Sequence, residues 1–240
     1  MRVALAQYKF INKNIDFNFL QIKRALEKAK GKADIVCFGE TFLQGFDALC
    51  WDYEKDKNVA ITQDSDIMKK ICELTTFTGV ALVFGYIEKD GENGGKIYSS
   101  CAVIEKGKII HNYRRISRGW KEFWKTDFHY SEGNEVEPFS YRGREFLLCL
   151  CGDMWDYPER FKTDCPVIWG VYVNFENAEL AEFEKDYAKQ VATVSDDVLM
   201  INSLSDFPDD VSHGGTFHFH LGEIKERCDY DKEELLIVEI

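Results

Sequence analysis

The sequence has 240 residues, of which 45% are hydrophobic and 30% are charged, a balance typical of a globular protein. Thirty Lys and Arg against 42 Asp and Glu give a net charge of −12. An acidic chain of this kind lacks the positive surface that binding to nucleic acid or anionic lipid requires. The sequence also shows no signal peptide and no apolar run long enough to span a membrane, so we expect a cytoplasmic protein.

Strands and helices are predicted to alternate along the chain, because short apolar runs are separated by segments with helical spacing of apolar residues. The first half predicts strands at 2–7, 33–38, 80–86, 99–105 and 108–111, and helices at 16–30 and 66–77. The second half predicts strands at 166–174, 198–202, 216–220 and 235–240, and a helix at 180–194. No linker or repeat interrupts this order, so we expect one domain over residues 1–240 with layered helices and sheet.

Two local patterns are better explained by ordinary structure than by a special site. The glycine-rich segment 90–95 is predicted to be a hairpin turn, because it lacks the GxxxxGK[ST] pattern of a phosphate-binding loop. The eight cysteines are spread through the chain without a CxxC pair. This distribution favours reduced thiols in a reducing compartment over a disulfide framework or a zinc site.

Three residues with reactive or charged side chains follow predicted strands. Glu40 follows the strand in ADIVCFGETFLQGF, Arg115 lies at the end of the strand in KIIHNYRRIS, and Cys151 ends the apolar run in LLCLCGDMWDYPERF. Taken alone, each has an ordinary interpretation: a solvated carboxylate, a basic sheet edge, and a small core residue. Together they are of interest, because side chains at the carboxyl ends of strands in layered α/β folds tend to converge on a site.

These segments resemble the nitrilase, or carbon–nitrogen hydrolase, superfamily. VALAQ and the helix after it are similar to the family's opening, and ADIVCFGETFLQGF to its first catalytic segment. LVFGYIEKDGENGGKIYSSCAVIEKGKIIHNYRR resembles the central hairpins that lead to the catalytic lysine, and HGGTFHFHLGEI a late strand pair. LLCLCGDMWDYPE resembles the nucleophile segment and selects Cys151 over Cys149. The resemblance implies a four-layer α-β-β-α sandwich.

The resemblance also implies a mechanism without metal or organic cofactor. Cys151 would attack an amide or nitrile carbon and form a thioester, with Glu40 as general base. A cation and the backbone N–H of Gly152 would hold the oxyanion. Family members commonly form dimers or higher oligomers, and we expect residues 157–162 and 180–194 to contribute to such an interface. The expected partners are therefore a small-molecule amide or nitrile and a second copy of the chain, with no nucleic acid and no membrane.

The main departure from the family pattern is Arg115, which stands where the family has lysine. Arginine keeps the positive charge, but its proton does not leave in a protein. Lys121 and Lys125 lie close enough in the sequence to be considered as substitutes. The family's second glutamate is expected in the same segment, with Glu122 as the candidate and Asp127 as the next choice.

Several aromatic and histidine residues have alternative interpretations. Trp155, Tyr157 and Tyr172 flank Cys151 and the next strand, and they are the candidates for a substrate pocket. The cluster Trp120, Phe123, Trp124, Phe128 and Tyr130 is equally compatible with a pocket wall or a packed loop. His218 and His220 alternate on a predicted strand, but no further ligand completes a metal site.

Three hypotheses follow from the sequence. The first is a cysteine-dependent hydrolase of a small-molecule C–N bond. The second is a nitrilase-fold protein that has lost catalysis through Arg115 and binds a small molecule or a partner. The third is a redox or structural role for the thiols, which the absence of CxxC disfavours.

Overall fold

Two six-stranded β-sheets form the body of the protein in the computed structural model, which describes residues 1–92, 94–176, 178–207 and 210–240. The first sheet has the order β14 (Glu234–Glu239), β1 (Arg2–Gln7), β2 (Ile35–Cys37), β3 (Ala81–Lys89), β4 (Ile97–Glu105) and β5 (Lys108–Arg114). The second has the order β13 (Glu223–Arg227), β12 (Phe217–His220), β9 (Asp197–Asn202), β8 (Val167–Val171), β7 (Arg144–Leu150) and β6 (Phe139–Tyr141). A separate hairpin consists of β10 (Leu204–Phe207) and β11 (Asp210–His213).

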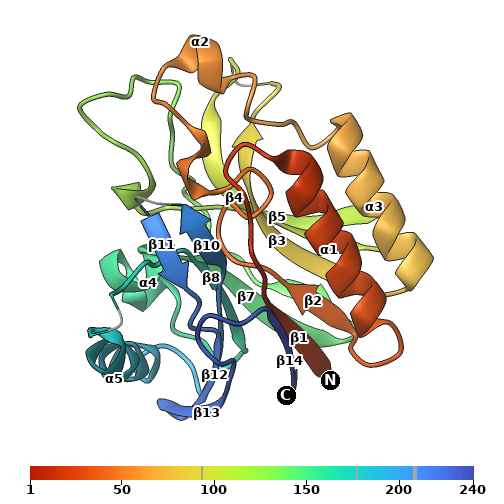
Figure 1. Ribbon diagram of the computed structural model, residues 1–240, viewed down its shortest axis with the longest axis vertical. Coiled ribbons are helices and arrows are strands. Elements are labelled where there is room, and N and C mark those ends of the chain that lie inside the picture. Colours follow the sequence, from red (N-terminus) through yellow and green to blue (C-terminus); the bar gives the residue numbers. More distant parts are fainter. Residues whose placement is uncertain (93, 177, 208–209) are drawn as a thin grey trace.

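Helices lie on the outer face of each sheet, so the architecture is a four-layer α-β-β-α sandwich (Figure 1). Helices α1 (Ile15–Ala29) and α3 (Asp66–Thr78) lie over the first sheet. Helices α4 (Asp153–Asp156) and α5 (Leu180–Val191) lie over the second. The remaining helical segments are short and are α2 (Tyr53–Asp56), η1 (Phe46–Ala48), η2 (Arg118–Trp120) and η3 (Pro158–Arg160).

The alternation of side chains along the strands explains this layering. In β1, Val3 and Leu5 belong to the core between the two sheets, where they join residues of β7, β8 and β9. Ala4 and Ala6 point the other way and pack with Ile22 of α1. Because successive side chains point to opposite faces of a strand, a strand that is apolar at every position is buried on both faces. Such runs are found in the central strands of both sheets.

The pairing of the central strands determines where the carboxyl ends of these strands lie. Strands β1, β2 and β3 are mutually parallel, and so are β7, β8 and β9. The carboxyl ends of β2 and β7 therefore each lie at one edge of a parallel set. Glu40 follows β2 and Cys151 follows β7.

Most of the predicted elements are present, with small shifts at their ends. The predicted helices correspond to α1, α3 and α5, and each predicted strand has a counterpart in the two sheets. The strand predicted at 166–174 ends at Val171, since the chain then turns so that the Val173 N–H bonds to the Asn202 side chain. The predicted turn at 90–95 includes residue 93, which lies outside the described residues.

Several elements lack a clear signal in the sequence. The sequence did not predict β6, β10, β11 or α2, which are three or four residues long, nor β13, whose residues are mostly exposed. In the described part of the chain, no helix combines the length and the apolar character that a membrane span requires.

Candidate active site

Cys151 lies in a strained turn between β7 and α4. Its φ angle is +36°, in the left-handed region that non-glycine residues seldom adopt. Two hydrogen bonds hold this conformation: the Cys151 N–H donates to Gly170 O at 2.9 Å, and Trp169 Nε1 donates to Cys151 O at 3.0 Å. Strain that is fixed by its surroundings is a reason to suspect function, and the residue is partly exposed to solvent.

Strand β8 brings Glu40 to the same place. Cys151 bonds to the carbonyl of Gly170, and the Glu40 N–H donates to the next carbonyl, that of Val171, at 3.3 Å. The thiol of Cys151 in turn lies 3.8 Å from Tyr172 O. Three consecutive carbonyl groups therefore hold the turn after β7 and the segment after β2 side by side. The close approach needs Gly39, where an added Cβ would lie 2.7 Å from Val171 O.

Arg115 forms a buried ion pair with Glu40. Its Nη1 lies 2.9 Å from Glu40 Oε1 and 3.2 Å from Oε2, and both side chains are at most 3% exposed. Ser99 Oγ donates to the same Oε1 at 2.7 Å, and Arg115 Nε donates to Ser117 Oγ at 2.7 Å. Oε1 thus has two close donors, whereas Oε2 has the longer contact with Arg115.

Asp153 connects the cysteine turn to the arginine segment. Its Oδ1 accepts from the N–H groups of Ile116 at 3.1 Å and Ser117 at 2.7 Å. Its Oδ2 accepts from Leu150 N–H at 3.1 Å and from the Tyr113 hydroxyl at 2.6 Å. A fully buried carboxylate with four donors fixes the relative position of the two segments.

The ionisable groups influence one another. Burial raises the pKa of the Cys151 thiol to about 11, with the positive charge of Arg115 acting in the opposite direction and Glu40 adding to the rise. Burial alone would lower the pKa of Arg115, but the nearby negative charge of Glu40 raises it overall. Arg115 is therefore a permanent cation, and Cys151 is a neutral thiol at pH 7 before substrate binds.

The structure does not bring Glu122 or the loop lysines to Glu40. Glu122 pairs with Lys125 at 3.5 Å on a partly exposed loop, and its carbonyl accepts from the Lys125 and Thr126 N–H groups. Asp127 bonds to His129. Lys121 has a largely buried side chain and pairs with Glu132 at 2.7 Å.

The Lys121–Glu132 pair is a feature that sequence reasoning missed. Ser131, the residue before Glu132, donates its N–H to Ile97 O on β4 at 2.9 Å. The residue after Glu132, Gly133, donates its N–H to Arg115 O at 2.9 Å. No motif marks this pair, or Ser99 and Ser117, because their roles depend on contacts that a local pattern does not record.

The three predicted pocket residues have different surroundings. Tyr172 is buried and stacks on Phe46, with ring centroids 4.6 Å apart. Trp155 is 41% exposed and packs against Tyr187 of α5, and Tyr157 packs against the core of the second sheet. Tyr172 is thus the one of the three with a direct backbone contact to the Cys151 thiol.

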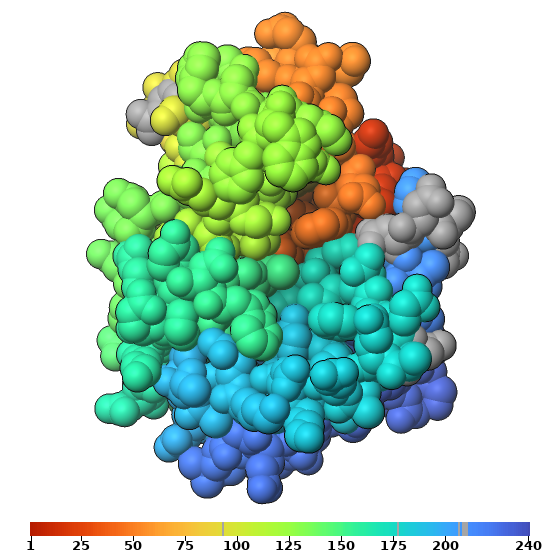
Figure 2. Space-filling view, turned by 90° about the vertical axis from the view of Figure 1, so that its left-hand side faces the viewer, coloured from red at the N-terminus to blue at the C-terminus, as the bar shows by residue number. Residues whose placement is uncertain are grey.

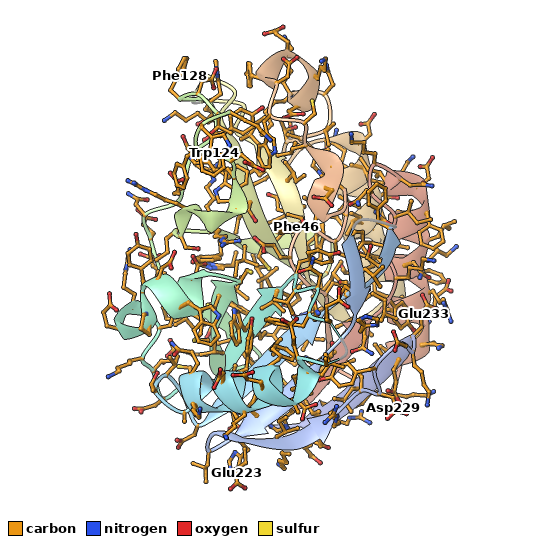
Figure 3. All side chains as sticks on the ribbon, turned by 60° about the vertical axis from the view of Figure 1, so that its left-hand side comes forward. Phe46, Trp124, Phe128, Glu223, Asp229 and Glu233 are labelled. Carbon is orange, nitrogen blue, oxygen red and sulfur yellow. The ribbon has the colours of Figure 1, made fainter. Side chains whose placement is uncertain are left out.

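The loops on the side of the first sheet carry exposed aromatic rings. Figure 3 shows Phe46 near the middle of the molecule and Trp124 and Phe128 on an outer loop. Trp124 is 82% and Phe128 74% exposed, whereas Trp120 and Tyr130 are buried and pack against the partly buried Trp51. In Figure 2 the segments around residues 45–55 and 118–135 form the upper part of one face, residues 150–195 lie below them, and residues nearer the C-terminus form the lowest part.

His218 and His220 do not form part of this site. Both bond to Asp197, and His218 also bonds to Glu226, on β9, β12 and β13. Within the described residues, no group of three His, Cys, Asp or Glu side chains is arranged to hold a metal ion.

The fold and the arrangement of a cysteine, a carboxylate and a cation at strand ends correspond to one class, the C–N hydrolases of the nitrilase type. The model of the carbon–nitrogen hydrolase family matches residues 2–159. The chain belongs to this family.

Two curated proteins show the range of its relatives. A glutamine-dependent NAD(+) synthetase of Thermotoga maritima is 23% identical over 160 residues, which is 65% of this chain and 26% of the relative. An arylacetonitrilase of Aspergillus niger is 25% identical over 145 residues, which is 57% of this chain and 42% of the relative. The matched segments thus span less than half of the length of each of these two relatives.

Solved structures show the same fold over nearly the whole chain. A CN-hydrolase superfamily protein of Xanthomonas campestris has a TM-score of 0.80 at 15% identity, covering 99% of this chain and 89% of that one. A mutant form of the amidase from Nesterenkonia sp. AN1 has a TM-score of 0.77 at 15% identity, covering 100% of this chain and 93% of that one. The expected nitrilase-type sandwich is confirmed by this likeness, which at such identity concerns the fold.

Proposed function

We propose that this protein hydrolyses the C–N bond of a small amide, or of a nitrile, through a thioester on Cys151. The observation that carries the proposal is the joint attachment of Cys151 and Glu40 to consecutive carbonyls of β8, with Arg115 paired to Glu40. The catalytic residues are Cys151 as nucleophile, Glu40 as general base and Arg115 as the fixed cation. The Gly152 N–H supports Arg115 at the oxyanion.

In the first half of the reaction, the Cys151 sulfur attacks the amide carbon. With a pKa of about 11 for the thiol, roughly one molecule in ten thousand is thiolate at pH 7, so the proton must leave as the sulfur attacks. Glu40 Oε2 is the suitable acceptor, because Oε1 already has two close donors. The C–N bond then breaks, and the amine takes the proton from Glu40 and leaves the acyl thioester.

In the second half, Glu40 takes a proton from water as the water oxygen attacks the thioester carbon. The C–S bond breaks, the carboxylic acid leaves, and the proton returns to the sulfur. In both halves, the negative charge on the former carbonyl oxygen needs donors. Among the described residues, Arg115 Nη2 and the Gly152 N–H donate to no acceptor, so both are available for this role.

Arg115 limits which leaving groups suit the site. Because its proton does not leave, Glu40 alone returns a proton to the departing amine. We therefore expect slower turnover of amides with basic amines than of activated esters, whose leaving groups depart as anions.

A test compares ammonia release from a panel of small amides and nitriles by wild type, Cys151→Ala and Glu40→Gln. The proposal predicts release by wild type and none by Cys151→Ala. Release that persists in Cys151→Ala would show that the nucleophile is another residue. If wild type releases nothing from any compound and Cys151 resists alkylation, the binding-protein hypothesis replaces this one.

We further propose that the chain self-associates through the surface of α4 and α5. This surface contains a hollow of about 710 Å³ whose apolar floor includes Trp155, Phe175, Phe183 and Tyr187. Three acidic residues also line the hollow, and Lys189 pairs with one of them, Asp186, at 2.8 Å, so the apolar floor is what supports a twofold contact. Sedimentation at micromolar concentration should show a dimer or a larger oligomer that Trp155→Glu dissociates, and a wild-type monomer would contradict the proposal.

The net charge and the free thiols support expectations about binding partners and cellular compartment. The net charge of −12 supports a protein without nucleic-acid or membrane partners. All eight cysteines are free, which supports a reducing compartment such as the cytoplasm.

A further inference from the structure

The guanidinium of Arg115 is held on three sides. Nη1 bonds to Glu40, and Nε donates to Ser117 Oγ at 2.7 Å. Nη2 faces two glycines: an added Cβ would lie 2.6 Å from it at Gly152 and 3.3 Å from it at Gly119. The planar fork of arginine therefore fills a space that has a specific partner or boundary for each nitrogen.

Backbone geometry does not explain the glycine at position 152. Its φ and ψ angles are −63° and −13°, in the right-handed helical region that any residue adopts. The space beside it does explain the glycine, because a separation of 2.6 Å between a methyl carbon and Nη2 is well below van der Waals contact. Neither group can move aside without breaking hydrogen bonds. Gly152 follows the fixed Cys151 turn, and Arg115 is tied to Glu40 and Ser117.

We propose that Gly152 and Ser117 form a seat for the guanidinium of Arg115, so that the identities of residues 115 and 152 are coupled. The seat keeps Nη1 bonded to Glu40, the general base. It leaves Nη2 beside the Cys151 turn, where Nη2 donates to the oxyanion that forms during the reaction. Ser117 and the missing side chain of Gly152 act by positioning Arg115, which is separate from the role of the Gly152 N–H at the oxyanion. The account rests on the proposed function for its catalytic meaning.

The coupling follows from the shapes of the two cations. A side chain at position 152 and the Nη2 group of arginine compete for one space. Lysine has a single terminal nitrogen and no atom that corresponds to Nη2. With lysine at position 115, a methyl group at position 152 fills the space that is otherwise left empty. Arg115→Lys alone leaves that space empty and removes the Nε donor from Ser117 Oγ.

Four proteins test the coupling: wild type, Gly152→Ala, Arg115→Lys and the double variant. We expect Gly152→Ala to lower kcat/KM about a hundredfold and Arg115→Lys about tenfold. The kcat/KM of the double variant should be about tenfold higher than that of Gly152→Ala. If the two effects were independent, the double variant would instead have the lowest kcat/KM of the four proteins. Gly119→Ala is the matched control, since its methyl group meets the same nitrogen at 3.3 Å, and it should change kcat/KM less than about threefold.

Alkylation of Cys151 gives a second readout that needs no substrate. In Gly152→Ala the displaced Arg115 no longer holds its positive charge beside the Cys151 thiol, so the pH profile of alkylation should move to higher pH. In the double variant the profile should return toward that of wild type. If wild type hydrolyses nothing, the proposed function fails while this shift still tests the seat. Should Gly152→Ala unfold, recovery of the melting temperature by the added Arg115→Lys is the expected result. Independent effects of the two substitutions on kcat/KM, alkylation and melting would overturn the inference.

Discussion

Asp153→Asn keeps the shape of a buried side chain and removes its charge, so it measures how firmly the cysteine turn is tied to the arginine segment. The carboxylate accepts four hydrogen bonds, two at each oxygen. If the asparagine oxygen faces Ile116 and Ser117, its NH₂ group faces the Leu150 N–H and the Tyr113 hydroxyl. The tyrosine hydroxyl can rotate to accept, but the Leu150 N–H then has no partner.

The expected cost follows from these contacts. An unsatisfied buried donor costs about 1–3 kcal/mol, and the remaining bonds lose the added strength of a charged acceptor. We therefore expect a loss of about 2–4 kcal/mol in the free energy of unfolding. With a urea dependence of about 3 kcal/mol per molar, the midpoint falls by roughly 1 M.

The assay is urea unfolding of wild type, Asp153→Asn and Asp156→Asn. Asp156 is an exposed residue of the same short helix, and its substitution should change the free energy by less than about 0.5 kcal/mol. An Asp153→Asn midpoint equal to that of wild type would refute the view that this carboxylate joins the two segments.

Further predictions concern the thiol, the base and the neighbouring arginine. The rate of Cys151 alkylation should rise about tenfold per pH unit from about pH 7 to about pH 10, because the reactive thiolate forms only as the pH approaches the pKa of about 11; a plateau near pH 8 would contradict this. Ser99→Ala removes a donor from Glu40 Oε1 and should lower kcat about tenfold with KM little changed, whereas an effect confined to KM would place Ser99 in substrate binding. Arg114→Met leaves the buried carboxylate of Glu88 without its two-bond partner and should cost about 3–5 kcal/mol in urea unfolding, but it should not move the alkylation profile. A shifted profile in Arg114→Met would show that the two adjacent arginines do not have separate roles.

Periodicity in the sequence was enough to predict the layers. Apolar runs such as that of β1 and the helical spacing of α1 each reflect burial against a neighbouring layer, and burial leaves a regular pattern. Segments such as β6 and α2 are too short for such a pattern. Their positions depend on contacts with distant parts of the chain, as in the bond from Tyr130 to Asp56 at the end of α2.

The candidate site was predicted only in part, for a related reason. Strand ends and the family pattern indicated Glu40, Arg115 and Cys151, and the structure brings Glu40 and Arg115 into contact next to the Cys151 turn. The pattern could not show that Ser99 and Ser117 complete the hydrogen bonds of the pair. Nor could it place Glu122, which the structure holds in a local turn with Lys125.

The central claim is a covalent acyl intermediate on Cys151, and intact-protein mass measurement after incubation with a small amide tests it most directly. The account predicts a mass increase equal to the acyl group, located by peptide mapping on the segment that contains Cys151 and absent from Cys151→Ala. It also predicts that hydroxylamine removes the adduct, as expected for a thioester. Amide turnover with no adduct on Cys151, or an adduct that persists in Cys151→Ala, would contradict the account.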